Sequence, residues 1–392
     1  MVRHVDLDRF WADNDAAIRA PFSPGIPQFP MGIAMGYEAI FSELGLPFNL
    51  RRLEEDYAFA RSAATAYNDK AERIVGRRLL EENAFDPARR FPKVKPLEEV
   101  FGCRNVWESD SWWALPAAGT PEELEKLLDQ VERLDLESEM FPPDWAPACR
   151  RIYEQHRLRP FLKLDLRGPV TLATSVFGVA NLVYLLNDAP RLALRFRDVI
   201  QRTAIAYYRV CRRVSDPLRM APGFSFRDDH CQMLTPDMYE QFALPILQAV
   251  FAEFAPGPND RRYQHSDSDM GHLLDPLSRA GLNVVNFGPK VRFERIRRHL
   301  PRAIVHGTLA PFTFMRNDEA AIIAEVRRDM DEARSTLGLV IDTAGSINDG
   351  SLLSSMRIVM WTIQSYGGLQ GAGDGLRSVN SVQGVLPKEV DR

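Results

Sequence analysis

The chain has 392 residues, a formal net charge of −4 and 45% hydrophobic residues. This length and composition are typical of a globular protein with an ample core, built as two ordinary domains or one large α/β domain. Lys and Arg are dispersed and form no basic stripe, so nucleic acid and anionic membranes are not expected as main partners. The cysteines Cys103, Cys149, Cys211 and Cys231 are far apart, which argues against a disulfide scaffold or a Cys-rich zinc module.

The beginning of the chain carries no apolar signal core, and no apolar run approaches the length of a transmembrane helix. A cytoplasmic protein is therefore expected. The N-terminal part has apolar residues at helical spacing, and we expect helices over residues 1–20, 31–44 and 51–83, the second ending at Gly45. None of them carries a catalytic pattern, so they are interpreted as helical additions to the main fold.

Between residues 91 and 147 the composition becomes rich in aromatic and acidic residues. Trp107, Trp112 and Trp113 can line a substrate pocket for a ring or an apolar group, or they can form a satellite core beneath loops. Further along, Thr120 followed by a proline and two glutamates predicts the start of a helix, with Thr120 as its N-cap.

From residue 158 onwards, short apolar runs of strand length alternate with segments of helix length. The expected strands are residues 160–164, 217–226, the stretch that ends at His265, and residues 283–288, 303–307 and 338–343. This alternation indicates a parallel sheet, and the absence of a Gly-rich nucleotide fingerprint favours a closed (β/α)8 barrel over a Rossmann sheet. The predicted fold is therefore α/β, a (β/α)8 TIM-type barrel domain over residues 1–366 with N-terminal helical additions. Residues 367–392 are expected to form a flexible, Gly- and Ser-rich tail.

Polar and titratable residues follow five successive predicted strands. Because parallel strands end at the same face of a barrel, we expect these residues to meet there. The expected catalytic residues are Asp228, Asp229, His230, His306 and Asp342, and Asn286 and Ser346 are expected to bind substrate together with the three tryptophans. Asp229 and His230 are both candidate proton donors, since a shift of one residue at a strand end exchanges them.

The stretch from residue 262 to 272 contains two histidines and two aspartates. Alternation along a strand would place Tyr263, His265, Asp267 and Asp269 on one side. His265 and Asp267, with a third donor from another strand, can bind zinc or another divalent metal. No nucleophile elbow, Walker loop, His-Glu-x-x-His or Cys-x-x-Cys motif is present, so acid–base or metal-assisted chemistry is expected.

Three blocks over residues 150–366 resemble the uroporphyrinogen decarboxylase superfamily, which includes the cobalamin-linked methyltransferases. The first is the helix start Gly168-Pro169-Val170-Thr171, the second runs from Phe226-Arg227-Asp228-Asp229 to Pro245, and the third runs from His265 through His306-Gly307-Thr308 to Ser346. The resemblance implies a (β/α)8 barrel with its active site at the carboxyl ends of the strands. It also implies a homodimer, the common assembly of the superfamily.

The chain departs from the patterns of both branches, and the first departure argues against a true decarboxylase. Decarboxylases of this superfamily have an arginine-containing segment that grips porphyrinogen carboxylates, whereas the corresponding residues 28–37 contain no arginine. The methyltransferase branch has a His-x-Cys zinc motif and a distant Cys. Here His265 matches the histidine, Asp267 stands in place of the first cysteine, and Ala344-Gly345 stands in place of the second.

Three functional hypotheses follow. The first is a methyltransferase-type enzyme that acts on a small methylated substrate, uses zinc or another divalent metal, and passes the methyl group to a corrinoid protein or another acceptor. The second is a decarboxylase or lyase of the same superfamily that uses carboxylates and histidines without metal. The third is a binding protein that has kept the barrel and lost the chemistry. Substrate and acceptor are left open by the sequence.

Overall fold

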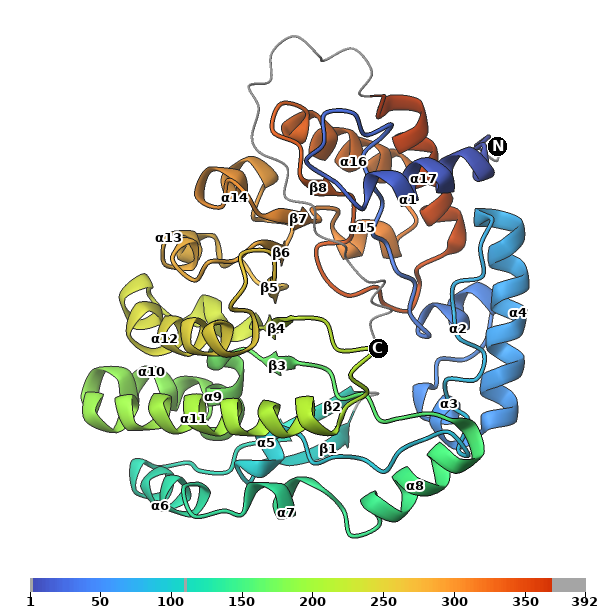
Figure 1. Cartoon of the computed structure of the whole chain (residues 1–392). Helices are drawn as coiled ribbons and strands as arrows, with labels where there is room; N and C mark the ends of the chain where they lie inside the picture. The colour runs from blue at the N-terminus through green and yellow to red at the C-terminus, as the bar shows by residue number, and fades with distance from the viewer. Residues whose placement is uncertain (1–2, 109–110, 369–392) are drawn as a thin grey trace. The chain divides into compact units, whose positions relative to one another are not determined.

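The computed structural model describes residues 3–108 and 111–368, so the predicted tail lies outside these ranges except for its first two residues. The described residues form two compact units, one within residues 86–282 and the other made of residues 3–85 and 283–368 (Figure 1). Within the described residues, no single helix is long and apolar enough to cross a membrane. The helices Pro169–Phe177 and Val179–Asp188 together have the length and composition of a membrane span, but they are bent by 100° relative to each other. All four cysteines are free thiols.

The unit formed by residues 86–282 contains a hairpin and a group of three parallel strands with their helices. Its elements are α5 (Leu97–Val100), β1 (Arg104–Glu108), β2 (Ser111–Leu115), α6 (Pro121–Val131), α7 (Leu136–Met140), α8 (Trp145–His156), β3 (Asp165–Arg167), α9 (Pro169–Phe177), α10 (Val179–Asp188), α11 (Pro190–Val214), β4 (Gly223–Arg227), η1 (Asp229–Met233), α12 (Pro236–Phe254), β5 (Arg261–Ser266), η2 (Gly271–Leu273) and α13 (Leu274–Ser278).

The other unit combines the N-terminal helices with the last strands. Its elements are α1 (Leu7–Ala17), α2 (Ala39–Leu44), α3 (Leu50–Glu55), α4 (Tyr57–Val75), β6 (Val284–Phe287), α14 (Phe293–His299), β7 (Ile304–His306), α15 (Pro311–Met315), α16 (Glu319–Ala333), β8 (Leu339–Val340) and α17 (Leu353–Tyr366). Parallel strands therefore alternate with helices in both units, which confirms the predicted α/β class.

Strands β3, β4 and β5 pair in parallel, so that Arg167 lies beside Arg227, and Arg227 lies beside His265. One face of these strands is apolar and packs against helices. Phe226 contacts Phe251 of α12 edge to face at a ring distance of 5.3 Å, and Phe224 contacts Tyr208 of α11 at 4.9 Å. Figure 1 shows α11 and α12 on the same side of these strands. Since side chains alternate across a strand, Ser225 and Arg227 point to the opposite face.

In the other unit, β6, β7 and β8 also pair in parallel, with Asn286 beside His306 and His306 beside Val340. The chain at Met31 adds a parallel bridge to Ile341, directly after β8. The amide of Gly32 donates to the carbonyl of Ile341 at 2.8 Å, and the amide of Ile341 donates to the carbonyl of Pro30 at 2.7 Å. These bonds extend the parallel pairing to the N-terminal part of the chain.

Helix capping follows the sequence where its signals are strong. Thr120 and Thr235 accept hydrogen bonds at the N-termini of α6 and α12, and each helix has proline in its first turn. Gly45 ends α2 in the left-handed conformation, with φ of 66°. The predictions at Thr120 and Gly45 are confirmed, and the start of α12 at Thr235 follows the same pattern as Thr120.

Several predicted elements are wrong in extent. The strand expected over residues 217–226 begins only at Gly223, and the helical stretch expected over residues 51–83 ends at Val75. The helix expected over residues 31–44 is restricted to Ala39–Leu44, because residues 30–32 pair with Ile341 as an extended segment. The strand expected over residues 160–164 begins only at Asp165. Before that point, the carbonyl of Pro160 and the amide of Leu162 bond to Asp216 and Ser215, in the loop after α11.

Candidate functional site

Asp228 follows β4 and is completely buried. Its carboxylate accepts the amide N–H of Thr171 at 2.8 Å, the hydroxyl of Thr171 at 3.0 Å and the amide N–H of Val170 at 3.4 Å. Burial raises the pKa of Asp228 to about 7, although the hydrogen bonds from Thr171 act in the opposite direction. A Cβ atom on Gly168 would lie 2.1 Å from the Asp228 Cβ, so only glycine leaves room for this carboxylate. Asp228 therefore joins the end of β4 to the first turn of α9.

The same threonine helps to place His230, which lies on η1. The Thr171 hydroxyl accepts the backbone N–H of His230 at 3.1 Å, and the Thr174 hydroxyl lies 2.6 Å from His230 Nδ1. His230 is otherwise exposed, so its ring is oriented at one nitrogen while the residue remains open to solvent. The first two turns of α9 therefore position both the buried acid and the exposed imidazole.

We expect Thr171→Val to lower the free energy of unfolding by about 1–3 kcal/mol, because the buried Asp228 carboxylate loses a donor and the His230 amide loses its acceptor. Urea unfolding measures the change. The matched control is Thr203→Val, at a half-buried position of α11, which is expected to change stability far less. Equal effects of the two substitutions would contradict the role given to the Thr171 hydroxyl.

Asp229, His265 and Asp267 bring three metal-ligating side chains together at the ends of β4 and β5. The Nε2 atom of His265 lies 2.9 Å from Asp267 Oδ1 and 3.9 Å from Asp229 Oδ1. One ligand atom of each residue lies within 4.8 Å of the other two, close enough for a single ion to contact all three. The backbone N–H of Asp267 donates to Asp229 Oδ1 at 2.8 Å and fixes the two acids relative to each other. We call these three residues the triad.

The triad differs from the predicted metal pair by one residue. His265 and Asp267 are the predicted ligands, and Asp229, which was assigned only a catalytic role, lies beside them. Asp269 is exposed and is not part of the triad. The predicted alternation holds to the end of β5 at Ser266, after which the chain leaves the strand. The sequence signal for Asp229 is its position two residues after the end of β4, the strand that pairs with β5.

In the unit that contains β6 to β8, His306 and Asp342 form a second polar group. His306 Nδ1 lies 3.2 Å from Asp342 Oδ2, and the Asn286 side chain donates to the carbonyls of His306 at 3.0 Å and Thr343 at 2.9 Å. A Cβ atom on Gly32 would lie 2.9 Å from Asp342 Oδ2, so this glycine allows the close approach of the N-terminal segment. Asn286 therefore braces the backbone at the ends of β7 and β8, and a His–Asp pair of this kind can transfer protons. Ser346 is exposed.

The loop that follows His306 is held by a buried acid. Asp329 of α16 accepts the Thr308 backbone N–H at 3.0 Å and the Thr308 hydroxyl at 2.8 Å, and it pairs with Arg328 at 2.7 Å. Burial raises the pKa of Asp329, while Arg328 opposes this shift.

We expect Asp329→Ala to lower the free energy of unfolding by about 3–5 kcal/mol, because Arg328 loses its acidic partner and two donors of Thr308 lose their acceptor. Thermal and urea unfolding measure this. The control is Asp331→Ala on the same helix, where the exposed carboxylate accepts the Tyr366 hydroxyl, and a loss below about 1 kcal/mol is expected. A loss at Asp329 no larger than that at Asp331 would contradict the anchoring role.

Residues 80–366 match the sequence model described as uroporphyrinogen decarboxylase (URO-D). The chain belongs to the uroporphyrinogen decarboxylase family. The family region includes Gly168, the triad, His306 and Asp342. The predicted superfamily is therefore confirmed.

Two solved structures are reported as similar to the chain. A methyltransferase from Methanosarcina mazei is 16% identical with a TM-score of 0.55, over 88% of this chain and 96% of that chain. A B12-independent methionine synthase from Shewanella sp. W3-18-1, in complex with selenomethionine, is 10% identical with a TM-score of 0.39, over 86% of this chain and 96% of that chain. No curated protein matches the chain. Family membership and the first of these similarities support the predicted TIM-type barrel with N-terminal helical additions.

Residues 28–37 stand where the family has its arginine-containing segment. In this structure they make hydrogen bonds to other parts of the chain. Gln28 is buried and donates to the carbonyl of Phe10 at 3.4 Å, and Met31 is tied by its amide to Asn14 at 2.6 Å. Tyr37 donates its hydroxyl to the carbonyl of Glu81 at 2.6 Å. These contacts tie the segment to neighbouring parts of its own unit.

The predicted aromatic group divides into two parts. Phe141 stacks on Trp145 at a ring distance of 4.8 Å, and Trp145 is buried, so this pair belongs to a core. Trp107 and Trp112 are paired backbone positions of the antiparallel hairpin β1–β2. The Trp113 side chain is 57% exposed, and that of Trp112 lies outside the part of the structure that is described. The substrate-binding role of the hairpin tryptophans stays a prediction.

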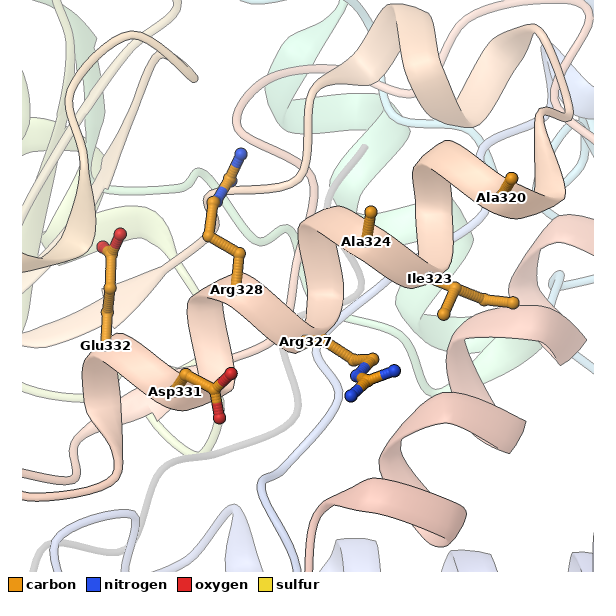
Figure 2. Close-up of a pocket in the computed structure, with 7 residues that line it drawn as sticks. All are labelled: Ala320, Ile323, Ala324, Arg327, Arg328, Asp331 and Glu332. Carbon is orange, nitrogen blue, oxygen red and sulfur yellow. The ribbon is translucent and has the colours of Figure 1, made fainter.

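A shallow surface pocket of about 610 Å³ runs along α16 (Figure 2). Its charged residues are engaged in contacts that hold the helix in place. Arg328 pairs with Asp329, Asp331 accepts the Tyr366 hydroxyl at 3.0 Å, and Glu332 pairs with Arg292. We interpret this surface as structural, and the triad is the stronger candidate for chemistry.

Proposed function

We propose that this chain is a methyltransferase-type enzyme that removes the methyl group from a small O-, N- or S-methylated substrate and passes it to a corrinoid protein or another acceptor. The observation that carries the proposal is the triad: an imidazole and two carboxylates converge at strand ends in a chain of the uroporphyrinogen decarboxylase family. The fold similarity to a methyltransferase is compatible with this assignment.

The donor set fits a divalent metal. One imidazole nitrogen and two carboxylate oxygens are ligands that zinc accepts, and harder divalent ions accept the carboxylates as well. His265 is a suitable ligand because its side chain is only 15% exposed and is held next to two acids. When bound, such an ion supplies Lewis-acid polarisation of the heteroatom that carries or receives the methyl group.

His230 is the proposed proton donor for the leaving heteroatom. Its Nδ1 contacts the Thr174 hydroxyl, which orients the ring. The residue is also exposed to solvent. When the methyl–heteroatom bond breaks, the electron pair remains on the heteroatom, and the methyl group bonds to a nucleophile of the acceptor. Protonation of the heteroatom makes it a better leaving group. Asp229 is a less suitable donor because its Oδ1 accepts the Asp267 amide and lies in the triad.

The alternative function is a decarboxylase or lyase without metal. The His306–Asp342 pair favours this alternative, because a half-buried imidazole next to a carboxylate can protonate the carbanion that forms when a carboxyl group leaves as carbon dioxide. His306→Ala is expected to abolish that reaction. In the methyltransferase proposal, the same substitution leaves the metal content unchanged.

A two-product assay separates these functions. The purified protein is incubated with methylated amines, alcohols, thiols and aryl ethers plus a reduced corrinoid acceptor, and formation of methylcorrinoid is followed by visible absorbance together with the demethylated product. Carboxylated substrates are tested in parallel for release of carbon dioxide. Methylcorrinoid formation that depends on His230 and the triad supports the proposal. Carbon dioxide release by a metal-free protein, or binding without turnover, would overturn it.

A further inference from the structure

His306 and Asp342 form a hydrogen-bonded pair that the proposed methyl transfer does not use. His306 is the last residue of β7, and Asp342 lies two residues after the end of β8, the strand that pairs with β7. The His306 Nδ1 atom lies 3.2 Å from Asp342 Oδ2, within the range of an N–H···O hydrogen bond. The side chains are 24% and 19% exposed, so the pair is sheltered while a ligand can still reach the ring.

The direction of this hydrogen bond follows from the chemistry of the two groups. A carboxylate accepts hydrogen bonds and has none to donate, so the hydrogen atom is on His306 Nδ1. The other carboxylate oxygen of Asp342, Oδ1, accepts the backbone N–H of Thr343 at 2.8 Å, so both oxygens act as acceptors. A neutral imidazole has one N–H group and one bare nitrogen. In neutral His306 the bare nitrogen is therefore Nε2, which has no hydrogen-bond partner among the residues that the structure describes.

Neighbouring groups hold the pair in this orientation. The Asn286 side chain donates to the carbonyls of His306 at 3.0 Å and Thr343 at 2.9 Å, which fixes the backbone beside both members of the pair. Gly32 packs on the bond between them, because a Cβ atom there would lie 2.9 Å from Asp342 Oδ2 and 3.3 Å from His306 Nδ1. The Nδ1 edge of the ring is therefore covered by main chain, which leaves Nε2 as the nitrogen that a ligand can approach.

We infer that Asp342 is a positioning residue that keeps neutral His306 in the tautomer with hydrogen on Nδ1, and that Nε2 accepts a proton from a ligand bound at the ends of β7 and β8. This inference goes beyond the proposed methyl transfer and does not depend on a metal in the triad. In the step, an O–H or S–H bond of the ligand breaks, its electron pair stays on the oxygen or sulfur, and the proton bonds to Nε2. The imidazolium that forms keeps its Nδ1–H directed at the Asp342 carboxylate, whose negative charge stabilises it.

Nuclear magnetic resonance of the full chain, labelled with 15N in its histidines, tests the tautomer directly. A ring nitrogen that bears hydrogen and a bare one have well-separated 15N shifts, and His306→Gln assigns the signals of His306. Two histidines act as internal references because each bonds to a carbonyl, which can only accept: His299 through Nδ1 at 3.0 Å and His272 through Nε2 at 2.9 Å. At alkaline pH, where histidine rings are neutral, His306 is expected to give the pattern of His299 and not that of His272.

Asp342→Asn is expected to reverse the tautomer of His306. The Thr343 N–H can only donate, so it retains the carbonyl oxygen of the new side chain, and the carboxamide NH2 group is directed at Nδ1. His306 then carries its hydrogen on Nε2 and offers a ligand no bare nitrogen. Diethyl pyrocarbonate acylates bare imidazole nitrogens, so it is expected to modify His306 at least about tenfold more slowly in this variant than in the parent chain. Peptide mass spectrometry follows the modification.

The matched control is Asp331→Asn, at an exposed acid of the same unit that accepts the Tyr366 hydroxyl, and it should be modified at His306 as fast as the parent chain. Hydrogen on Nε2 of His306 in the parent chain would overturn the inference, and that result needs no variant. An unchanged tautomer or an unchanged rate in Asp342→Asn would overturn it as well, as would equal slowing by Asp331→Asn. Metal content is a separate readout, so failure of the metal proposal leaves this test intact.

Discussion

His265→Ala is expected to reduce the metal content of the purified protein from about one equivalent to none and to lower methyl transfer by at least about 100-fold. His265 contributes the only nitrogen of the triad, and its Nε2 lies within 3.9 Å of both acids. Loss of groups that merely orient a metal ligand commonly lowers affinity or activity 10–100-fold, so loss of a ligand itself should do at least as much. Metal analysis by mass spectrometry and the methylcorrinoid assay measure the two effects separately.

His272→Ala is the matched control. His272 lies seven residues further along the same stretch, where its Nε2 bonds to the carbonyl of Leu234 at 2.9 Å, outside the triad. This control should retain metal and activity. Asp267→Asn tests the triad from the other side, because it keeps the shape of the side chain and removes the charge. Full metal content in both His265→Ala and Asp267→Asn would rule out the triad as a metal site.

Gly168→Ala is expected to lower the free energy of unfolding by about 3 kcal/mol or more, at the upper end of the range for overpacking of a buried site. The added Cβ would lie 2.1 Å from Asp228 Cβ and 2.3 Å from Asp228 Cγ. Asp228 is short, buried and bonded to the first turn of α9, so it cannot swing away without losing its hydrogen bonds. Urea unfolding measures the loss.

A double-mutant cycle checks the cause. In a background with Asp228→Gly, the Gly168→Ala substitution should be much less destabilising, because the clashing side chain has been removed. Gly119→Ala is the control for loss of a glycine as such, since the nearest atom to a Cβ there is 3.5 Å away, at ordinary van der Waals distance. An equal effect of Gly168→Ala in both backgrounds would exclude the contact with Asp228 as its cause.

Much of the architecture was predictable because its determinants are local. The helix starts at Thr120 and Thr235 depend on a hydroxyl and a proline within one turn. The contact between His265 and Asp267 is likewise local, since the two residues are separated by a single position at a strand end. The order of strands and helices identifies the fold class for the same reason, because alternating apolar runs can be read from neighbouring residues.

Errors in the predicted elements arose where a distant partner decides the local conformation. Residues 31–38 have the small residues of a helix, but Met31 is held extended by its bridge to Ile341, about 310 positions later in the chain. The apolar run of residues 160–164 resembles a strand, yet Pro160 and Leu162 bond to the loop after α11, and bonding to β4 starts only at the carbonyl of Leu164. Propensity is a weak guide when such long-range hydrogen bonds compete with it.

The sequence by itself determined the α/β class, the family, and the acids and imidazoles that follow the strands. Only the tertiary structure decided that Asp229 joins His265 and Asp267, that Gly168 makes room for Asp228, and that Arg167 and Arg227 stand in one row with His265. The physical reason is that strand register and close packing depend on residues far apart in the chain. A shift of one position in the pairing of β3, β4 and β5 would send the strand side chains Arg167, Arg227 and His265 to the opposite face.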